Sequence, residues 1–551
     1  MSKNLSELSG RKGLENNLFE EIGIAARPTG TPSKEKLEEL ANAFLIGKAN
    51  TYGTATFYDF TRPENQGKEV YVCNGSACLT AGTQDEVHSK LCGEFGADKV
   101  GSMYCLGRCH ENRAFYFNGH NYSGSAIDRI SEIRKGDASA SADQYGSTHL
   151  GTAVLTESFP GLEAYYELLP AALNKSRNDL LEEIKTSGVR GRGGAGFPMG
   201  MKLETCKNTE NETKFVVCNA DEGDPGAYSD RWLLEQRPHS VLLGMMLTGY
   251  IIGAQWGVVY IRGEYPESIE ICNAAISEIR NRGWLGENIL GTGFSFDFKV
   301  IAAQGAYICG EETALLNSIE GQRPEVRTRP PFPAQSGLFN KPTVVNNVET
   351  LACVPWILRE GGAKYATIGR GRSTGTKLVS LDGYFHKPGV YEVDMGTPLQ
   401  TVFDQLGGGL KSPVKAMHIG GPLGGLVPKH KVPELTVDFE SFQQAGFLLG
   451  HASVVCIPQN FPIVKYIEHL FEFTAHESCG KCFPCRLGST RGKELFQKAI
   501  NEDRKIDRTL LDDLLNTMEI GSLCALGGGL PLPIKNALQY FADELNPFLE
   551  N

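Results

Sequence analysis

The chain has 551 residues, of which 41% are apolar and 22% are charged, so it can form roughly three or four domains with substantial cores. Its net charge of −11 at pH 7, without any long lysine or arginine run, argues against nucleic-acid binding. The sequence shows neither a secretory signal nor an apolar run of about 18 residues, so we expect a cytoplasmic protein without direct membrane insertion.

Fifteen cysteines in such a chain indicate metal or redox chemistry, not disulfide bonds. The first stretch, residues 1–60, is polar and is predicted to form a helical arm. Within it, Lys34–Ala49 has the helical period. An arm of this size buries little surface alone, so we expect it to dock on the domains after it. Its apolar face is predicted to carry Leu37, Leu40, Ala41, Phe44 and Leu45.

Residues 61–136 are predicted to form a small α/β domain. The expected elements are strand Lys68–Cys73, helix Gln84–Cys92, a strand and turn over Val100–Cys109, strand Arg113–Asn118 and helix Ile127–Arg134. Four cysteines follow two of the strands, spaced C-x4-C and, after twenty-six residues, C-x3-C: Cys73, Cys78, Cys105 and Cys109. Four thiolates on such loops can hold a [2Fe–2S] cluster. A four-thiolate zinc site, or four unrelated thiols, are the alternatives.

These cysteines, together with the stretches Gly53–Tyr58 (GTATFY) and Cys105–Arg113 (CLGRCHENR), resemble the thioredoxin-like [2Fe–2S] subunit of NADH dehydrogenases. The resemblance implies a thioredoxin-like fold for this domain and a [2Fe–2S] cluster on its four cysteines. The helical arm is shorter than is usual in that family.

Residues 137–150 are small and polar, which is typical of an interdomain linker. The next segment, 151–371, alternates helix and strand patterns in the α/β manner. A helix over Ser176–Thr186 precedes a loop with four glycines in six positions, which suits a phosphate or a flat ring. Strand Lys214–Cys218 ends in carboxylates and an amide, where an open α/β sheet binds ligands. A further strand is expected at Val258–Arg262, with a helix after Pro266. Another helix, Thr313–Ile319, follows Glu311 and Glu312, which either bind ribose hydroxyls or complement the dipole of that helix.

This segment resembles the flavoprotein (F) subunit of respiratory complex I. The matching stretches are Arg190–Pro198 (RGRGGAGFP), Val217–Gly226 (VCNADEGDPG), Tyr307–Gly321 (YICGEETALLNSIEG) and Lys341–Thr350 (KPTVVNNVET). The resemblance implies a Rossmann-like domain whose FMN contacts are Gly191, Arg192, Gly193, Gly194, Ala195, Gly196, Lys202, Asn219, Asp221, Glu222, Tyr307, Gly310, Glu311, Asn346 and Asn347.

It further implies that Phe197 and Phe332 stack on the nicotinamide nucleotide and that Glu312 meets its adenosine ribose. Asp224 and Arg329 belong to the same predicted cofactor site. This chain departs from the family at three positions: Asp224 replaces a glutamate, Arg329 a lysine and Leu203 a tryptophan. The first two changes keep the charge but alter its reach, which affects the preference between NAD and NADP.

Residues 372–457 are predicted to be a small β-rich module and resemble the β-grasp insert of the same family. His386, His418 and His430 are isolated and are predicted to be surface or packing residues. The last segment, 458–551, is predicted to be a helical bundle that contains C-x2-C-x2-C and a distant fourth thiol. This spacing holds three corners of a [4Fe–4S] cube, and it matches the cluster motif of the family: Cys479, Cys482, Cys485 and Cys524. The other cysteines, Cys92, Cys206, Cys218, Cys272, Cys309, Cys353 and Cys456, are predicted core thiols.

Together the resemblances imply a fused chain that acts as an NADH:acceptor oxidoreductase (diaphorase) component. A hydride passes between NAD(H) and FMN, and single electrons pass through the clusters to or from a partner. No catalytic side chain is required; Glu222 and Glu311 are the nearest candidates. Fusions of this kind occur in soluble NAD-dependent formate dehydrogenases and NAD-reducing hydrogenases. Their partners are an iron–sulfur subunit and a catalytic subunit with molybdenum or tungsten, or with nickel and iron. The alternatives are the NADH-binding subunit of complex I and, remotely, a non-enzymatic zinc-binding scaffold.

Overall fold

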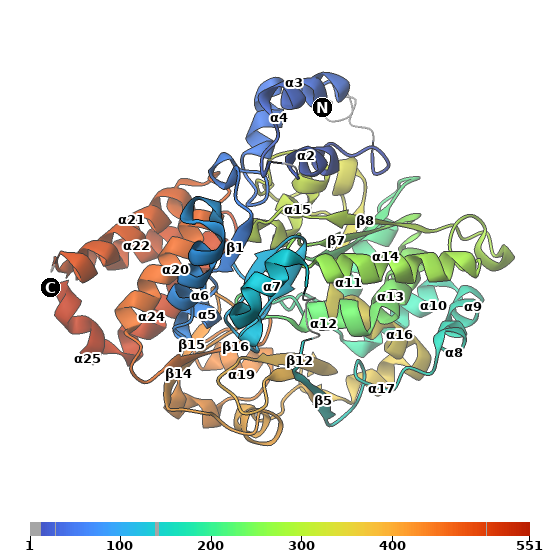
Figure 1. The fold of residues 1–551 in the computed structure, drawn as a ribbon. Helices are drawn as coiled ribbons and strands as arrows, with labels where there is room; N and C mark the ends of the chain where they lie inside the picture. Colours follow the sequence, from blue (N-terminus) through green and yellow to red (C-terminus); the bar gives the residue numbers. More distant parts are fainter. Residues whose placement is uncertain (1–12, 28, 138–142, 503, 551) are drawn as a thin grey trace.

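The structure is a computed structural model that describes residues 13–27, 29–137, 143–502 and 504–550. Figure 1 shows the N-terminal helices at the top, the helices of the central α/β region at the right and the C-terminal helices at the left. Within these described ranges, no helix combines the length and the apolarity that crossing a membrane requires.

The N-terminal arm is a set of three helices, α2 (Leu18–Ala26), α3 (Lys34–Ala43) and α4 (Lys48–Ala55). The single helix predicted over Lys34–Ala49 is therefore wrong, since α3 ends at Ala43. Leu45 adopts a left-handed backbone (φ 52°) that turns the chain, and its side chain is 71% exposed and not on the buried face. The other four predicted residues of that face are buried. The predicted docking is confirmed, because Tyr58 just after α4 bonds Ser318 of the central region (2.9 Å).

The first α/β domain has a four-stranded sheet in the order β2-β1-β3-β4. Its strands are β1 (Val70–Cys73), β2 (Val100–Met103), β3 (Phe115–Phe117) and β4 (His120–Tyr122), and its helices are α5 (Ser76–Thr80), α6 (Gln84–Phe95) and α7 (Ile130–Lys135). Helix α7 starts three residues later than predicted because a 3-10 turn, Gly124–Arg129, precedes it. Strands β1 and β2 are parallel neighbours, so the loops that follow them, which carry the four cysteines, leave the sheet at the same edge.

The central region contains a parallel sheet in the order β8-β7-β6-β9. Its strands are β6 (Phe215–Ala220), β7 (Trp256–Ile261), β8 (Asp297–Ala302) and β9 (Thr343–Asn347). The chain first moves outward from β6 to β8 and then returns to the other side of β6. Ligands bind at such a reversal, beyond the carboxyl ends of the strands. The region beyond the carboxyl ends of the neighbouring strands β6 and β9 is therefore the expected site.

Strand β6 ends two residues later than predicted, and β7 begins two residues earlier. Helices pack around this sheet. Helix α13 is buried along most of its length, as expected for a helix inside a large core. The helices are α8 (Leu162–Tyr166), α9 (Leu168–Leu173), α10 (Arg177–Ser187), α11 (Met199–Asn208), α12 (Ser229–Gln236), α13 (Pro238–Ile252), α14 (Pro266–Asn281), α15 (Glu312–Ile319), α16 (Val348–Glu360) and α17 (Gly362–Ala366).

A six-stranded mixed sheet follows, in the order β15-β14-β16-β12-β13-β5. Five strands lie in the predicted β-rich module or extend one residue past it: β12 (Thr376–Leu381), β13 (Gly389–Asp394), β14 (Val414–Ile419), β15 (Gly425–Pro428) and β16 (Ser453–Pro458). The short pair β10 (Gly369–Arg370) and β11 (Ser373–Thr374) precedes them. Helices α18 (Leu399–Thr401) and α19 (Phe439–Gln444), and a π-helical turn Val402–Leu406, complete the module.

The sixth strand, β5 (Gly146–Leu150), comes from the predicted linker 137–150 and corrects that prediction. It pairs in parallel with β13, from Gly146 opposite Gly389 to Leu150 opposite Val393. Its side chains are mostly exposed, so backbone hydrogen bonds and not an apolar face hold it at the sheet edge. That explains why no alternating pattern marks it in the sequence. The part of the predicted linker at 138–142 lies outside the described residues.

The C-terminal segment is helical, as predicted. Helices α20 and α21 pack against each other, and a two-residue ladder joins β17 (Ile506–Asp507) to β18 (Leu549–Glu550). The buried core of this segment is formed largely by aliphatic side chains. The helices are α20 (Ile463–Glu477), α21 (Phe483–Asn501), α22 (Arg508–Gly521), α23 (Ala525–Gly529), α24 (Pro531–Tyr540) and α25 (Ala542–Leu545).

Candidate functional site

The four cysteines predicted to hold a [2Fe–2S] cluster come together beside the first sheet. Cys73 ends β1 and Cys78 lies in α5, whereas Cys105 and Cys109 lie in the loop after β2. All four are at most 3% exposed. The sulfurs of Cys105 and Cys109 are 3.4 Å apart, and the thiol of Cys73 reaches both Cys78 and Cys105. Four buried cysteines that lie beside one another fit a four-thiolate ligand set.

Cys105 and Cys109 pack in the hydrophobic cluster of the central region, and a backbone hydrogen bond joins the group to the loop after β6. The amide of Gly226 donates to the sulfur of Cys109 (3.2 Å). Gly226 has φ 94°, and a Cβ there would lie 2.6 Å from Val455, so another residue would not fit. Gly226 ends the loop after β6 that also carries Asp221 and Asp224. The predicted [2Fe–2S] and FMN sites therefore share one loop.

The second cysteine group lies where two C-terminal helices begin. Cys482 is the N-cap of α21 and Cys524 is the N-cap of α23. Cys479 and Cys485 are buried in a hydrophobic cluster against which the two half-buried cysteines pack. The hydroxyl of Ser478 lies 3.3 Å from the sulfur of Cys485. The three cysteines of the C-x2-C-x2-C motif and the distant fourth cysteine thus lie together. The N-terminus of α21, the positive end of its helix dipole, lies beside them.

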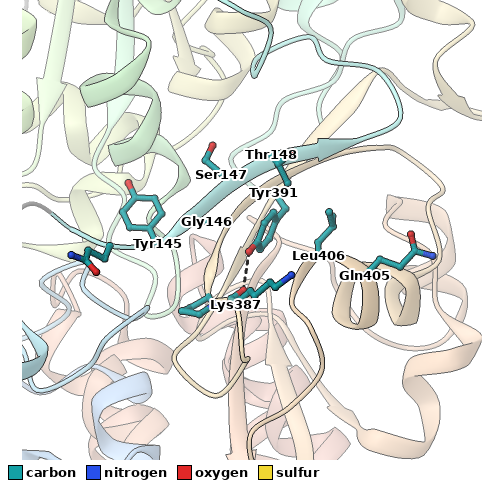
Figure 2. Close-up of a pocket in the computed structure, with 10 residues that line it drawn as sticks. Tyr145, Gly146, Ser147, Thr148, Lys387, Tyr391, Gln405 and Leu406 are labelled. Atoms are coloured by element: carbon teal, nitrogen blue, oxygen red, sulfur yellow. Dashed lines mark hydrogen bonds between the residues drawn. The ribbon is translucent and has the colours of Figure 1, made fainter.

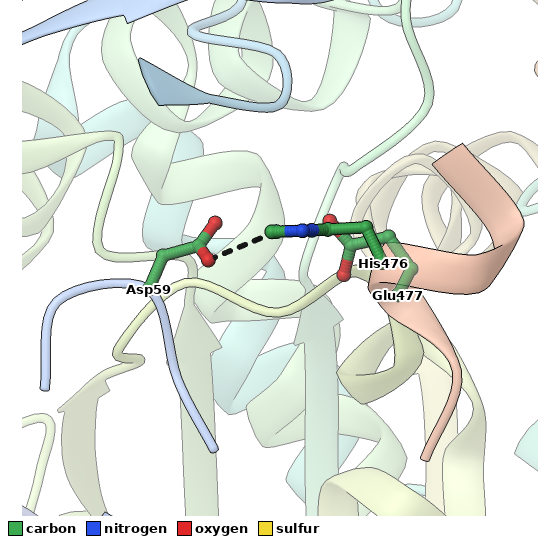
Figure 3. Close-up of side chains that lie close together, drawn as sticks. All are labelled: Asp59, His476 and Glu477. Atoms are coloured by element: carbon green, nitrogen blue, oxygen red, sulfur yellow. Dashed lines mark hydrogen bonds and ion pairs between the residues drawn. The ribbon is translucent and has the colours of Figure 1, made fainter. Parts of the chain in front are cut away.

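Figure 3 shows a cluster of Asp59, His476 and Glu477 that joins the N-terminal arm to the segment just before Cys479. The carboxylate of Asp59 lies 3.1 Å from His476 and 2.9 Å from the guanidinium of Arg62. Glu477 accepts the amide of Tyr307 (2.8 Å), and burial raises the pKa of Glu477 to about 7. The guanidinium of Arg62 already supplies a positive charge to this cluster. We therefore interpret the cluster as an ion-pair network that fixes the arm, not as a metal site.

The glycine loop connects α10 to α11 and closes on itself. The amide of Gly191 donates to the carbonyl of Phe197 (2.8 Å). Gly194 has φ 120°, which a side chain rarely permits. A Cβ on Gly193 would lie 3.0 Å from Asn347, so the loop approaches the end of β9 directly. Backbone groups that no side chain covers can approach a phosphate or a flat ring closely.

Arg192 is the predicted loop residue whose side chain lies elsewhere. Its guanidinium is fully buried and donates to the carbonyl of Thr374 (2.6 Å), the hydroxyl of Tyr365 (3.2 Å) and the sulfur of Met395 (2.9 Å). Arg192 therefore anchors the glycine loop to α17, to β11 and to the residue that follows β13. Only its backbone can contribute to a ligand contact in this arrangement.

The polar residues predicted at the strand ends do meet between β6 and β9. Asn219 lies opposite Asn347 in the register of the two strands, and it donates to the carbonyl of Gly310 (2.8 Å). Oδ2 of Asp221 and Nδ2 of Asn346 are buried, and neither has a hydrogen-bond partner among the residues that the structure describes. Buried polar atoms are costly without partners, so these two atoms fit the polar edge of a bound heteroaromatic ring such as that of FMN.

Two predicted carboxylates have protein partners. Glu222 accepts the amides of Asp230 (2.9 Å) and Arg231 (3.1 Å) and the hydroxyl of Tyr265 (3.1 Å). Burial raises the pKa of Glu222 to about 8. Asp224 accepts the hydroxyl of Tyr307 (2.7 Å), and burial raises its pKa as well. Both residues therefore organise the loop after β6 and are not free acids or bases.

The sequence left two roles open for Glu311 and Glu312: to bind ribose hydroxyls or to complement the dipole of α15. The structure gives the two residues different partners. Glu311 is the N-cap of α15 and accepts the amides of Thr313 and Ala314 (both 2.9 Å), as expected of a helix N-terminus. Glu312 instead pairs with Arg329 (3.0 Å) and with Lys202 (3.3 Å). Its partner Lys202 also donates to the carbonyl of Val345 in β9 (2.8 Å).

The two aromatic rings predicted to stack on a nucleotide are open to solvent. Phe197 is 49% exposed and Phe332 is 52% exposed. The guanidinium of Arg329 lies 6.0 Å from the centre of the Phe332 ring. Exposed rings of this size can cover a planar ligand. Arg329 links one of them to Glu312, the predicted ribose contact.

Sequence reasoning missed His451, which follows α19 and is buried beside Glu222 and Asp230. A lone histidine in a β-rich stretch gives no recognisable spacing, so no signal could have identified it. His418, predicted as a packing residue, is buried and bonds Tyr466 (2.8 Å). The predicted core thiols are buried, except that Cys92 is half-buried.

A hollow of about 510 Å³ beside β5 is unrelated to these groups. Figure 2 shows it between β5 and the segments around Lys387 and Leu406, with the hydroxyl of Tyr391 bonded to the carbonyl of Lys387 (2.9 Å). None of its lining residues is a predicted cofactor contact. The hollow therefore provides no support for a cofactor site at this edge of the sheet.

Three family models match successive parts of the chain. Residues 15–136 match the thioredoxin-like [2Fe-2S] ferredoxin, residues 184–356 the Nuo51 FMN-binding domain, and residues 465–547 the NADH-ubiquinone oxidoreductase-F iron-sulfur binding region. The NADH-quinone oxidoreductase F 2 subunit of Rhizobium meliloti (strain 1021) is 42% identical over 389 residues, which cover 70% of this chain and 92% of that protein. The chain belongs to the family of NADH-quinone oxidoreductase F subunits.

Further similarities reach beyond complex I. Subunit HndC of the NADP-reducing hydrogenase of Solidesulfovibrio fructosivorans is 41% identical over 389 residues, which cover 70% of this chain and 79% of that protein. A chain in the crystal structure of an air-oxidized NAD+-reducing [NiFe]-hydrogenase has a TM-score of 0.86 and 29% identity, and covers 98% of this chain and 94% of its own length. This structural similarity therefore extends over nearly the whole chain, with the N-terminal domain included.

As an F-type relative with an additional N-terminal domain, the chain has an FMN-binding domain, a [4Fe–4S] region and a [2Fe–2S] domain. The predicted fold class, an α/β multidomain chain with these three parts, is confirmed. The two cysteine groups and the strand-end polar residues described above lie inside the matched ranges.

Replacing Cys73 with serine should remove the [2Fe–2S] signal, because a serine hydroxyl is a much poorer iron ligand than a thiolate. We expect NADH still to reduce the flavin, since Cys73 does not contact the glycine loop. Electron paramagnetic resonance of NADH-reduced protein measures the first effect, and flavin bleaching measures the second.

The matched control is Cys92→Ser, which changes a half-buried thiol of the same domain outside the ligand group. It should keep the full [2Fe–2S] signal. Metal analysis of the wild-type protein that finds zinc and no iron in this domain would contradict the cluster assignment.

Proposed function

We propose that the chain is the NADH-oxidising (diaphorase) subunit of a larger complex and carries electrons between NAD(H) and a partner subunit. The observation that carries this proposal is the loop after β6. It holds Asp221 and Asp224 of the predicted FMN site, and its Gly226 amide bonds the cluster cysteine Cys109 (3.2 Å). A flavin site and an iron–sulfur site that share a loop suit electron exchange within one chain.

The residue assignments follow from the predicted contacts. We assign the [2Fe–2S] cluster to Cys73, Cys78, Cys105 and Cys109, and the [4Fe–4S] cluster to Cys479, Cys482, Cys485 and Cys524. FMN is assigned to the region beyond the carboxyl ends of β6 and β9, beside the glycine loop. The segments 61–136, 151–371 and 458–551 then each hold one redox group, and the module 372–457 supports the glycine loop through Arg192.

When bound, FMN accepts two electrons together as a hydride and passes them singly to iron–sulfur clusters. The chain itself binds and orients. The glycine loop admits a cofactor close to its backbone, and the unpartnered atoms of Asp221 and Asn346 offer an acceptor and a donor to the ring. Phe197 and Phe332 offer exposed faces for the nicotinamide nucleotide. Positioning of the two reactants is the protein's main contribution to the rate.

Neither candidate carboxylate acts as a general acid or base in this scheme. Glu222 is held by the start of α12, and Glu311 caps α15. Both therefore serve as structural supports of the cofactor site. This agrees with a reaction whose chemistry resides in the cofactors, not in a side-chain nucleophile.

For the partner we propose an iron–sulfur subunit together with a catalytic subunit, either of an NAD-dependent formate dehydrogenase or of an NAD-reducing [NiFe]-hydrogenase. The similarity along 98% of the chain to a hydrogenase chain supports this class. The alternative is the NADH-binding subunit of a complex I, which the 42% identical relative supports. Fifteen free cysteines suit a reducing compartment, so we propose that the complex works in the cytoplasm.

The test is purification of the whole complex through a tag on this chain. We expect flavin and iron–sulfur absorbance that NADH bleaches, and a copurified subunit that contains molybdenum, tungsten or nickel. Copurified membrane subunits with quinone reductase activity would favour complex I. A colourless zinc protein that NADH does not change would refute the proposal and favour a scaffold.

A further inference from the structure

His451 is part of a buried trio with Glu222 and Asp230, which two distant parts of the chain bring together: the loop after β6 with the start of α12, and the segment after α19. It is 5% exposed, and its Nε2 lies 3.2 Å from Oδ2 of Asp230 and 3.8 Å from Oε1 of Glu222. The carboxylate of Glu222 already accepts several hydrogen bonds from α12 and Tyr265. The trio therefore has the arrangement of a charge network, in which Oδ1 of Asp230 is the carboxylate oxygen without a hydrogen-bond partner among the described residues.

The trio lies directly behind the predicted flavin site. Oδ2 of Asp230 accepts a second hydrogen bond, from Nδ2 of Asn347 (2.6 Å), and Oδ1 of Asn347 accepts the amide of Glu349 (2.9 Å) at the start of α16. The side chain of Asn347 also touches the position of Gly193 in the glycine loop. His451 is thus two hydrogen bonds from the loop-facing residue Asn347, through one shared carboxylate oxygen.

The backbone at His451 approaches the same loop. Cα of the preceding residue, Gly450, lies 3.7 Å from the place where a Cβ of Gly194 would stand. Gly450 itself packs on Gly420. His451 is therefore connected to the glycine loop on two sides, through Asn347 and through the backbone of Gly450.

The charges of the trio favour an imidazolium at neutral pH. Burial opposes the charged form, but the carboxylate of Asp230 outweighs it and raises the pKa of His451 to about 9. Burial, with Asp230 adding to it, raises the pKa of Glu222 to about 8. Lys377 also acts on His451, but its ammonium is paired with Glu349. The imidazolium of His451 thus lies behind the glycine loop, and the carboxylate of Asp230 balances its charge.

We propose that His451 is a positioning residue for the flavin: through Asp230 it orients Asn347, and its positive charge raises the reduction potential of the bound cofactor. This rests on the proposed function. Reduction adds electron density to the flavin ring, so a nearby fixed cation stabilises the reduced form more than the oxidised form. Without that charge the carboxylate of Asp230 acts on the flavin unopposed.

The test compares three variants of the full chain with wild type: His451→Gln, which removes the charge, His451→Lys, which keeps it, and His418→Gln. His418 is also buried, but it lies in β14 against Tyr466, outside the trio. The flavin midpoint potential is measured by a spectroelectrochemical titration at pH 7. His451→Gln should shift the equilibrium between oxidised and reduced flavin about tenfold toward the oxidised form, which is about 30 mV for a two-electron couple.

His451→Lys should keep the potential closer to that of wild type than His451→Gln does, and His418→Gln should leave it unchanged. An unchanged potential in His451→Gln would overturn the proposal. If that variant does not fold, His451→Lys decides, because a tenfold shift there despite the retained charge also overturns it. The proposed function is checked in the same samples: failure of NADH to bleach wild type refutes that function, whereas normal bleaching with an unshifted variant refutes only the role of His451.

Discussion

Cys482→Ala is expected to remove the [4Fe–4S] signal and to stop electron delivery to the partner subunit, while NADH still reduces the flavin. Cys482 is the middle thiol of C-x2-C-x2-C and the N-cap of α21, so its loss opens one corner of the cube. Loss of an outer-shell partner alone costs about 10–100-fold in metal sites. Loss of a direct ligand should therefore reduce partner-linked turnover by at least about 100-fold.

Two assays separate the effects of this variant. An artificial acceptor that takes electrons from the flavin should retain much of the wild-type rate, whereas the partner-linked rate falls. Cys272→Ala is the control, since it truncates a buried thiol in α14 that is outside both ligand groups. Full partner-linked turnover in Cys482→Ala would mean that the C-terminal cysteines do not lie on the electron path.

Local patterns predicted those features that local chemistry decides. The spacing of the cysteines identified both groups, because cluster geometry restricts how far apart consecutive ligands stand. The apolar run followed by Asn219 identified β6, because parallel strands expose polar residues only where they end. For β9 the sequence analysis predicted cofactor contacts at Asn346 and Asn347, but not the strand itself. The N-cap at Ser176 likewise marked the start of α10.

Features set by distant contacts escaped prediction. Strand β5 has exposed side chains and is held by its backbone pairing with β13, so nothing in its own sequence indicates a strand. Leu45 has the apolar character and the spacing of a buried helix residue, yet a left-handed turn places it outside. The positive charge of His451 is stabilised by Asp230 and Glu222, which are more than two hundred residues away in the chain.

The arrangement also explains how a fused chain can work as one electron-transfer unit. The ion-pair network of Asp59, Arg62 and His476 holds the arm against the segment that precedes Cys479. Glu477 of that segment accepts the amide of Tyr307, and the hydroxyl of Tyr307 bonds Asp224. The FMN-type loop, the [4Fe–4S] segment and the arm are therefore joined by a continuous series of hydrogen bonds.

The second large effect is expected at Glu312, the predicted contact of the adenosine ribose. Glu312→Gln should weaken NADH binding by about 1.5–3 kcal/mol, the value of a hydrogen bond to a charged group. The structure adds a second consequence. Glu312 pairs with both Arg329 (3.0 Å) and Lys202 (3.3 Å), so its loss removes the carboxylate partner of Lys202 and leaves Arg329 with Glu311 alone (3.5 Å). The guanidinium fork of Arg329 matches a phosphate well.

The ratio of kcat/KM values should therefore move toward NADPH by roughly tenfold or more, because repulsion of the 2′-phosphate disappears and the positive charge of Lys202 and Arg329 is less fully neutralised. Steady-state kinetics with both nucleotides measure the ratio, and Glu325→Gln, an exposed carboxylate near Arg323, is the control that should leave it unchanged. If wild type already uses NADPH as well as NADH, or if Glu312→Gln keeps the wild-type ratio, another residue discriminates between the two nucleotides.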